Sequence, residues 1–188
     1  MLGHDERRRL VAGLNGRVVE IGAGAGAMFP HYPTDVASVV AVEPDRNRRA
    51  AAERAARRAR VPIRVVDGVA ERLPLADGAV DAAVASLVLC SVPDVSAALS
   101  ELRRVLRPAG ALRFLEHVVA GRGPLRVLQR AAAPVYSRLP DGCHIDRDTL
   151  ASIASAGFAI EECDRFMHAD GVFEPAIPHV IGTARRSD

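Results

Sequence analysis

Short apolar segments alternate with charged, helix-forming segments along most of this chain of 188 residues. Five of the apolar segments are expected to form strands, over residues 17–21, 36–42, 63–66, 80–86 and 111–118. They are almost continuously apolar, which is typical of strands in a parallel sheet that is covered by helices on both faces. The alternation therefore predicts a doubly wound α/β fold.

The segments between and after these strands complete the predicted fold. Helices are expected over residues 5–14, 46–60, 94–106, 122–139 and 146–156, with Pro134 interrupting the fourth. Asp94 can cap the third helix, and the sequence Pro108-Ala109-Gly110 can end it. Two final strands are expected over residues 158–166 and 177–184. No linker or repeat divides the chain, so a single domain is expected to span residues 1–188.

Composition excludes several classes of protein. An apolar fraction of 49% with 26% charged residues is typical of a globular protein and excludes a disordered or fibrous chain. The net charge of +2 provides no field that would attract nucleic acid. No apolar run approaches the roughly 18 residues that span a bilayer, and no secretion signal begins the chain. Cys90, Cys143 and Cys163 lack zinc or disulfide spacing, so we expect a reduced, cytoplasmic protein.

A glycine-rich turn follows the first expected strand, with the sequence Glu20-Ile-Gly22-Ala-Gly24-Ala-Gly26. Glycine tolerates positive φ and lets a ligand approach the backbone closely. Glu43 ends the second strand, where its carboxylate can accept both hydroxyls of an adenosine ribose. A tight turn without a ligand is the alternative, but Glu43 favours a nucleotide site. Glu20 lies inside an apolar strand, so we expect it to anchor the loop backbone or to face a cationic ligand.

Two later motifs narrow the interpretation. Glu71-Arg-Leu-Pro-Leu-Ala-Asp-Gly78 precedes Asp81, and Leu102-Arg-Arg-Val-Leu-Arg-Pro-Ala-Gly110 follows. Together with the glycine turn they resemble the E-x-G-x-G-x-G, LPF-dg-fD and RVLkPGG signatures of class I S-adenosylmethionine-dependent methyltransferases, over about residues 15–118. The resemblance implies a mostly parallel, seven-stranded Rossmann-like sheet, S-adenosylmethionine as cofactor, and transfer of a methyl group to a small molecule.

The resemblance also implies which residues bind the cofactor. They are Glu20, Gly22, Ala23, Gly24, Gly26, Glu43, Pro44, Asp67, Gly68, Val69, Ala70, Ser86 and Leu87. Val69 stands where the family commonly has an aspartate that binds the adenine amino group. Adenine is then expected to contact apolar atoms and the backbone N–H near Ala70, or Asp67 replaces the aspartate. Ala109 replaces a family glycine, which is tolerable if its φ is negative.

Further segments resemble the thiol S-methyltransferase (methyltransferase-like) group. They are residues 28–33, 87–92, 116–117, 141–143 and 178–182. This resemblance implies a small apolar acceptor such as a thiol, and a small helical cap at about residues 119–146, inserted after the fifth strand. Because only 19 residues precede Glu20, we expect the membrane-anchoring segment of the animal members to be missing and the first acceptor-capping helices to be truncated.

Acceptor-side residues are expected after the fourth and fifth strands, because ligands lie outside the carboxyl ends of such strands. His117 is the catalytic candidate, since an imidazole can take a proton from the acceptor near neutral pH, or else it is a hydrogen-bonded structural histidine. Other candidates on this side are Tyr32, Cys90, Glu116, Cys143 and His144. Cys90 could instead be a small buried residue, and residues 141–144 a simple turn. Cys143 and His144 are adjacent without partners at ligand spacing, so no metal is expected.

The helix expected over residues 122–139 has more than one interpretation. It places Leu125, Leu128, Ala132, Val135 and Leu139 at helical spacing. It could be a lid over the acceptor, a helix in weak contact with a membrane surface, or a packed surface helix. For the whole chain, the alternatives to a methyltransferase are a nicotinamide-dependent oxidoreductase, suggested by the glycine turn alone, and a non-catalytic module that binds S-adenosylmethionine.

Overall fold

One sheet runs through the part of the chain that the structure describes. The computed structural model describes residues 3–121, 123–136, 138, 142–169 and 176–187. Within these residues the sheet has seven strands: β1 (Gly16–Ile21), β2 (Val36–Val42), β3 (Ile63–Val66), β4 (Val80–Ser86), β5 (Leu106–His117), β6 (Phe158–His168) and β7 (Ile177–Arg186). Their order is β3-β2-β1-β4-β5-β7-β6; β7 runs antiparallel to β5 and β6, and the other four strand pairs are parallel. The predicted doubly wound, mostly parallel sheet is confirmed.

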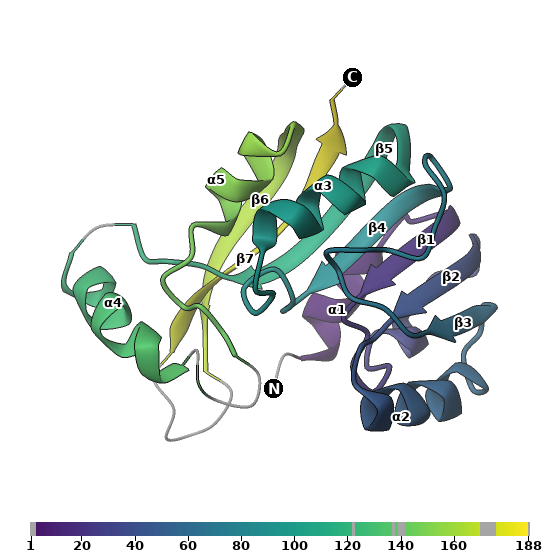
Figure 1. The fold of residues 1–188 in the computed structure, drawn as a ribbon, viewed down its shortest axis with the longest axis horizontal. Coiled ribbons are helices and arrows are strands. Elements are labelled where there is room, and N and C mark those ends of the chain that lie inside the picture. Colours follow the sequence, from purple (N-terminus) through teal and green to yellow (C-terminus); the bar gives the residue numbers. More distant parts are fainter. Residues whose placement is uncertain (1–2, 122, 137, 139–141, 170–175, 188) are drawn as a thin grey trace.

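Helices cover both faces of this sheet (Figure 1). Those on the faces are α1 (His4–Val11), α2 (Arg46–Ala56), α3 (Val95–Val105) and α5 (Thr149–Ser155), whereas α4 (Pro124–Tyr136) lies to one side of the sheet; a short 3-10 helix, η1, covers Phe29–His31. Asp94 caps α3 as expected, because its side chain accepts a hydrogen bond from the backbone N–H of Ala97. None of the helices in the described part of the chain is both long and apolar enough to cross a membrane.

Alternate residues of each central strand pack into two separate apolar layers. In β4, Ala83 and Ala85 contact the layer under α3 and α5, which includes Leu99 of α3 and Ile153 of α5. Ala82 and Val84 face the opposite layer, which includes Leu10 of α1 and Ala52 of α2. Because both faces are buried, the centre of the strand is apolar at four consecutive positions, Ala82 to Ala85, and this explains the continuous apolar segments of the sequence.

The expected strands at β2, β3 and β4 have the bounds that the structure shows, but β5 does not. It begins at Leu106, five residues earlier than expected, and its pairing with β4 shifts register between Val80 and Ala82. The expected turn at Pro108-Ala109-Gly110 therefore lies inside this irregular start of the strand. Ala109 has a φ of 57°, so it lacks the negative φ that would make alanine easily tolerated in place of the family glycine.

Candidate active site

A cavity of about 380 Å³ opens at the carboxyl ends of the first four strands. This volume is within the usual range of small-molecule sites, about 300–1,000 Å³. Seven of the predicted cofactor residues line it, namely Gly22, Glu43, Pro44, Gly68, Val69, Ala70 and Leu87. They come from the loops after β1, β2, β3 and β4, which the parallel arrangement brings to one edge of the sheet. The cavity is therefore where the sequence predicts the cofactor.

Glu43 holds the glycine turn in place at this edge. Its Oε2 atom accepts a hydrogen bond of 2.8 Å from the backbone N–H of Gly24, and its Oε1 atom accepts one of 2.9 Å from the N–H of Asp45. The carboxylate is nearly buried, yet it lines the cavity. Each carboxylate oxygen can accept more than one hydrogen bond. Glu43 can therefore order the turn and still face a ligand.

The glycine turn is shaped for the close approach of a ligand. Gly22 and Gly24 have φ values of 59° and 56°. A Cβ atom on Gly22 would lie 2.4 Å from Cγ2 of Val88, whereas one on Gly24 would meet nothing within 4 Å. The backbone at Gly24 therefore faces open space, and the backbone at Gly22 is packed against the wall of the cavity.

Glu20 and Tyr32 form a buried pair behind the turn. The Tyr32 hydroxyl donates a hydrogen bond of 2.7 Å to Oε2 of Glu20, and only about 2% of each residue is exposed. Burial raises the pKa of the Glu20 carboxyl to about 8, although the Tyr32 hydrogen bond opposes this shift. Glu20 anchors Tyr32, and Tyr32 lies in the core under the turn rather than among the residues that line the cavity.

Other predicted cofactor residues lie beside the cavity or away from it. Asp67 forms an ion pair of 2.8 Å with Arg49, and its side chain is 74% exposed. It does not line the cavity, whereas Val69 does and is half-exposed. Ala23, Gly24, Gly26 and Ser86 are likewise absent from the lining. This placement favours apolar contact and the backbone near Ala70 over Asp67 for holding adenine.

The sequence interpretation missed six residues of the cavity wall. They are Arg48, Glu71, Val88, Ser91, Val92 and Pro93. Four of them belong to the loop after β4. That loop follows a central strand of a doubly wound sheet, and this position was the signal that could have identified them.

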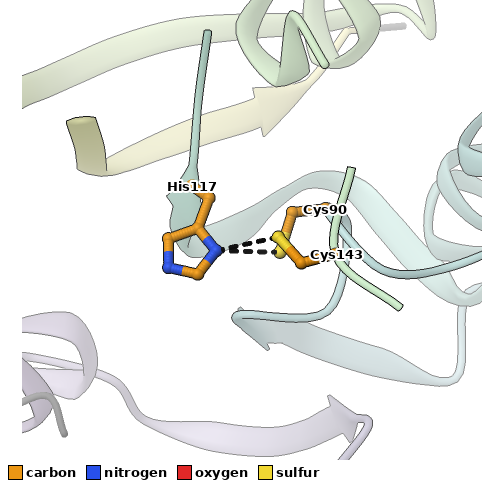
Figure 2. Close-up of side chains that lie close together, drawn as sticks. All are labelled: Cys90, His117 and Cys143. Carbon is orange, nitrogen blue, oxygen red and sulfur yellow. Dashed lines mark hydrogen bonds between the residues drawn. The ribbon is translucent and has the colours of Figure 1, made fainter. Parts of the chain in front are cut away.

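Of the residues expected on the acceptor side, Cys90, His117 and Cys143 converge although they are far apart in the sequence (Figure 2). The Nδ1 atom of His117 lies 2.9 Å from Sγ of Cys143 and 3.7 Å from Sγ of Cys90. Cys90 is almost completely buried, and the other two residues are partly exposed. A hydrogen bond from Cys90 lowers the pKa of the Cys143 thiol, because it stabilises the thiolate.

Glu116 orders the loop that carries Cys90. Its completely buried carboxylate accepts hydrogen bonds from the backbone N–H groups of Val88, Leu89 and Cys90, at 3.0–3.1 Å. Burial raises the pKa of this carboxyl, while the three donors oppose the shift. Glu116 therefore positions the loop that forms the cavity wall and does not line the cavity itself.

Several hydrogen bonds fix the segment that carries Cys143. The backbone N–H of His144 donates to the carbonyl of Cys90 at 2.7 Å. The Nε2 group of buried Gln129, in α4, donates to the carbonyl of Ile145 at 3.0 Å. Arg147 donates to the carbonyls of Leu89 and Val92. The segment is thus tied to the loop after β4 and to α4; Asp141, predicted beside it, lies outside the described residues.

No metal is expected from the neighbours of Cys143 in the sequence, but the structure gives Cys143 neighbours in space that could serve as ligands. Cys90 and His117 lie beside Cys143, and potential ligand atoms of the three residues are within 4.8 Å of one another. His144 contacts Cys90 through its backbone N–H group, by the hydrogen bond described above.

The comparisons with known proteins agree with this geometry. The family model described as a methyltransferase domain matches residues 19–114. The chain belongs to this methyltransferase family. Over 171 residues it is 34% identical to thiol S-methyltransferase TMT1B of Rattus norvegicus, covering 89% of this chain and 69% of the relative. It is 31% identical over 145 residues to phosphatidylethanolamine N-methyltransferase of Cereibacter sphaeroides, covering 74% of this chain and 70% of that relative.

The fold of this methyltransferase also occurs in solved structures. A protein from Bacillus halodurans superimposes with a TM-score of 0.81 and 16% sequence identity, covering 99% of this chain and 100% of the other. The methyltransferase uses S-adenosylmethionine as its cofactor. Its cavity fits this group, since Gly22 and the nearly buried carboxylate of Glu43 line it, beside the open backbone at Gly24. The family membership supports a methyltransferase over the two alternatives, a nicotinamide-dependent oxidoreductase and a non-catalytic binding module.

Proposed function

We propose that this S-adenosylmethionine-dependent methyltransferase transfers a methyl group to the sulfur of a small, apolar thiol. The observation that most supports this proposal is the extent of the similarity to the rat thiol S-methyltransferase. It covers 89% of the chain, so it must include most of the region after β5, beyond the family model that ends at residue 114. That region includes Cys143, and we assign to it the expected helical cap of about residues 119–146. We treat all 188 residues as one domain for this activity.

The residues around the cavity are assigned roles in holding the cofactor. Glu43 accepts hydrogen bonds from the ribose hydroxyls, and the backbone of the Gly22–Gly26 turn approaches the amino acid part. Val69 and Ala70 contact the adenine. S-adenosylmethionine supplies a methyl group on a positively charged sulfur, which is already activated for transfer. The chain therefore has to align the acceptor and exclude water, an effect that can lower a barrier by about 7–11 kcal/mol.

The cavity wall supports an apolar acceptor. Leu87, Val88 and Val92, in the loop after β4, are aliphatic residues that line the cavity. A thiol has a pKa of about 8.5 and is partly ionised at neutral pH, so it needs little help to lose its proton. The role of His117 as a base stays a prediction. Its Nδ1 atom faces two cysteine sulfurs, so a proton from the acceptor would have to reach it beside them.

A panel of acceptors with one carbon skeleton tests the proposal. Purified protein is incubated with S-adenosylmethionine and phenylmethanethiol, benzyl alcohol or benzylamine, and methylated products are quantified by mass spectrometry. We expect turnover with the thiol and at most a few per cent of that rate with the alcohol and the amine. Methylation of the amine or alcohol without methylation of the thiol would contradict the assignment.

A further inference from the structure

Three side chains that are good ligands for soft and borderline metal ions meet at the carboxyl ends of β4 and β5. Cys90 comes from the loop after β4, His117 ends β5, and Cys143 comes from the segment after α4 (Figure 2). We propose that Cys90, His117 and Cys143 bind a zinc ion through two thiolate sulfurs and the imidazole Nδ1 atom. Neither the family model nor the relatives described above carry a metal in their names.

The distances are close to those of a zinc site. In a tetrahedral site, bonds of about 2.3 Å to sulfur and about 2.0 Å to nitrogen place these two atoms about 3.5 Å apart. Nδ1 of His117 is 3.7 Å from Sγ of Cys90 and 2.9 Å from Sγ of Cys143. The first separation already fits. The second is a hydrogen-bond distance, so the ion would replace that contact and move Cys143 outward by about half an ångström.

The ligand chemistry selects the metal. Thiolate sulfur and imidazole nitrogen favour zinc over magnesium or calcium, which prefer oxygen ligands. Two thiolates neutralise the charge of a divalent ion, so no net charge is left in a largely buried place. On binding, the ion displaces the protons of the two thiols to the solvent and forms two metal–sulfur bonds, with no change of oxidation state.

The backbone that carries the ligands is already fixed. Glu116 holds the Cys90 loop through three backbone hydrogen bonds, and His144 ties the Cys143 segment to the carbonyl of Cys90. The hydroxyl of Thr149 donates to the carbonyl of His117 at 3.3 Å. Each ligand therefore has a partner that limits its movement, as in metal sites whose ligands are oriented by a surrounding layer of hydrogen bonds.

The fourth coordination position points to a role in the reaction, and this step rests on the proposed function. Among the described residues, the group holds three potential protein ligands. Three ligands with an open fourth position are typical of catalytic rather than structural zinc. Val88 and Ser91, in the loop that carries Cys90, line the cavity, so the ion would be close to the bound acceptor. The open position suits the acceptor sulfur, which would bind as a thiolate after losing its proton to solvent.

Metal binding by the reduced, chelator-treated full chain tests the site directly. Zinc alone is titrated by calorimetry, and cobalt(II) alone is titrated by absorption spectroscopy. We expect one equivalent of each, with a sulfur-to-cobalt charge-transfer band and the strong visible bands of a tetrahedral ion. Cys143→Ser should weaken zinc binding by more than the roughly 10–100-fold that loss of a supporting partner costs. Cys163→Ser is the matched control, because Cys163 lies in β6 outside the cluster, and its affinity should not change.

A measurement on the unmutated protein covers the case in which Cys143→Ser fails to fold. Alkylation by N-ethylmaleimide, followed by peptide mass spectrometry, should show that zinc protects the partly exposed Cys143 but not the partly exposed Cys163. Absence of a stoichiometric zinc complex in the reduced protein, or binding that survives Cys143→Ser, would overturn the proposal. So would zinc that leaves the alkylation rate of Cys143 unchanged.

The fourth position has its own readout. Phenylmethanethiol should change the cobalt spectrum of the loaded protein, whereas benzyl alcohol should not; an unchanged spectrum would overturn the assignment of this position. The result also separates the two proposals. Zinc binding without methylation of any thiol would retain the metal site and contradict the proposed function. Thiol methylation at full rate by a protein that binds no zinc would retain the proposed function and contradict the metal site.

Discussion

Gly24 is the residue of the glycine turn at which we expect a side chain to interfere most directly with cofactor binding. Its φ of 56° is unfavourable for residues with a Cβ, and its Cβ position faces open space. Gly24→Ala should therefore raise the Kd of S-adenosylmethionine at least tenfold, because the methyl group and any backbone adjustment both affect the turn. Isothermal titration calorimetry measures this effect.

Gly13→Ala is the matched control for that experiment. Gly13 has a φ of 71°, and its Cβ position also meets nothing within 4 Å, but it lies between α1 and β1. Both variants should lose a similar stability of about 1–2 kcal/mol, and only Gly24→Ala should lose affinity. Equal affinities for the two variants would show that the cofactor does not approach the turn.

Ala109 carries a strain that the family glycine would not. Its φ of 57° costs an alanine about 1 kcal/mol or more relative to glycine, which outweighs the extra freedom that glycine has in the unfolded chain. We expect Ala109→Gly to stabilise the protein by up to about 1 kcal/mol in urea unfolding. Destabilisation would show that the backbone relaxes to a negative φ in solution.

The sequence locates glycine-dependent turns but does not give the φ of other residue types. The turn at Gly22–Gly26 is predictable because glycines there follow an apolar strand. The positive φ values of Ala109 and Leu87 are not predictable, because alanine and leucine usually adopt negative φ values. Leu87 lies at the cavity, with its N–H bonded to the carbonyl of Leu115, so tertiary hydrogen bonding imposes its conformation.

At the scale of elements, apolar patterning predicts the central strands better than it predicts α4. The buried strands need no choice of face, and their bounds at β2, β3 and β4 agree with the structure. In α4 the expected apolar stripe included Leu128 and Val135, which are 63% and 62% exposed. Gln129 is buried instead. Its three hydrogen bonds to backbone groups offset the burial of its amide, and no helical pattern could reveal them.

Gln129 is therefore expected to control how α4 attaches to the sheet. Its side chain accepts from the N–H of Ala120 and donates to the carbonyls of Val118 and Ile145. Gln129→Leu leaves these buried groups unsatisfied, and each can cost about 1–3 kcal/mol. We expect a loss of at least about 2 kcal/mol in unfolding free energy and an increased KM for the acceptor, since Ile145 lies close to Cys143 in the chain.

The neighbouring variant Arg130→Gln provides the comparison for α4. Arg130 is exposed in the same helix, so its replacement should change the unfolding free energy by less than about 0.5 kcal/mol and leave KM unaltered. If Gln129→Leu were equally silent, α4 would be attached to the sheet by other contacts.

At the scale of the whole molecule, the two halves of the site differ in how far they can be predicted. The cofactor half is built from successive strand-to-helix loops, so sequence order and strand ends already place Gly22 and Glu43 together. The cluster of Cys90, His117 and Cys143 joins two strand ends and a segment beyond α4. Sequence order places Cys90 and His117 at neighbouring strand ends, but the contact with Cys143 depends on tertiary hydrogen bonds through Glu116 and Gln129, which spacing in the sequence does not reveal.

The stability of the whole molecule should depend on pH through Glu20, which lies far from the cysteine cluster in the sequence. Burial raises the pKa of its carboxyl in the folded protein to about 8, from the usual 4.5. Between these two values the folded state binds one more proton than the unfolded state. The unfolding free energy should therefore fall as pH rises through this window, by at most about 1.4 kcal/mol per pH unit from this group.

Glu20→Gln isolates this contribution, because the amide does not ionise and its oxygen can still accept the hydrogen bond from Tyr32. Other titrating groups affect both proteins equally and cancel in the difference between their unfolding free energies. From pH 5 to pH 8 that difference should shift steadily in favour of the variant, and it should level off above pH 8 once Glu20 is ionised in both states. Urea unfolding at constant ionic strength, with reductant and without metal, measures it. Parallel curves for the two proteins would show that Glu20 is already ionised in the folded state at neutral pH, paired with a cation or solvated.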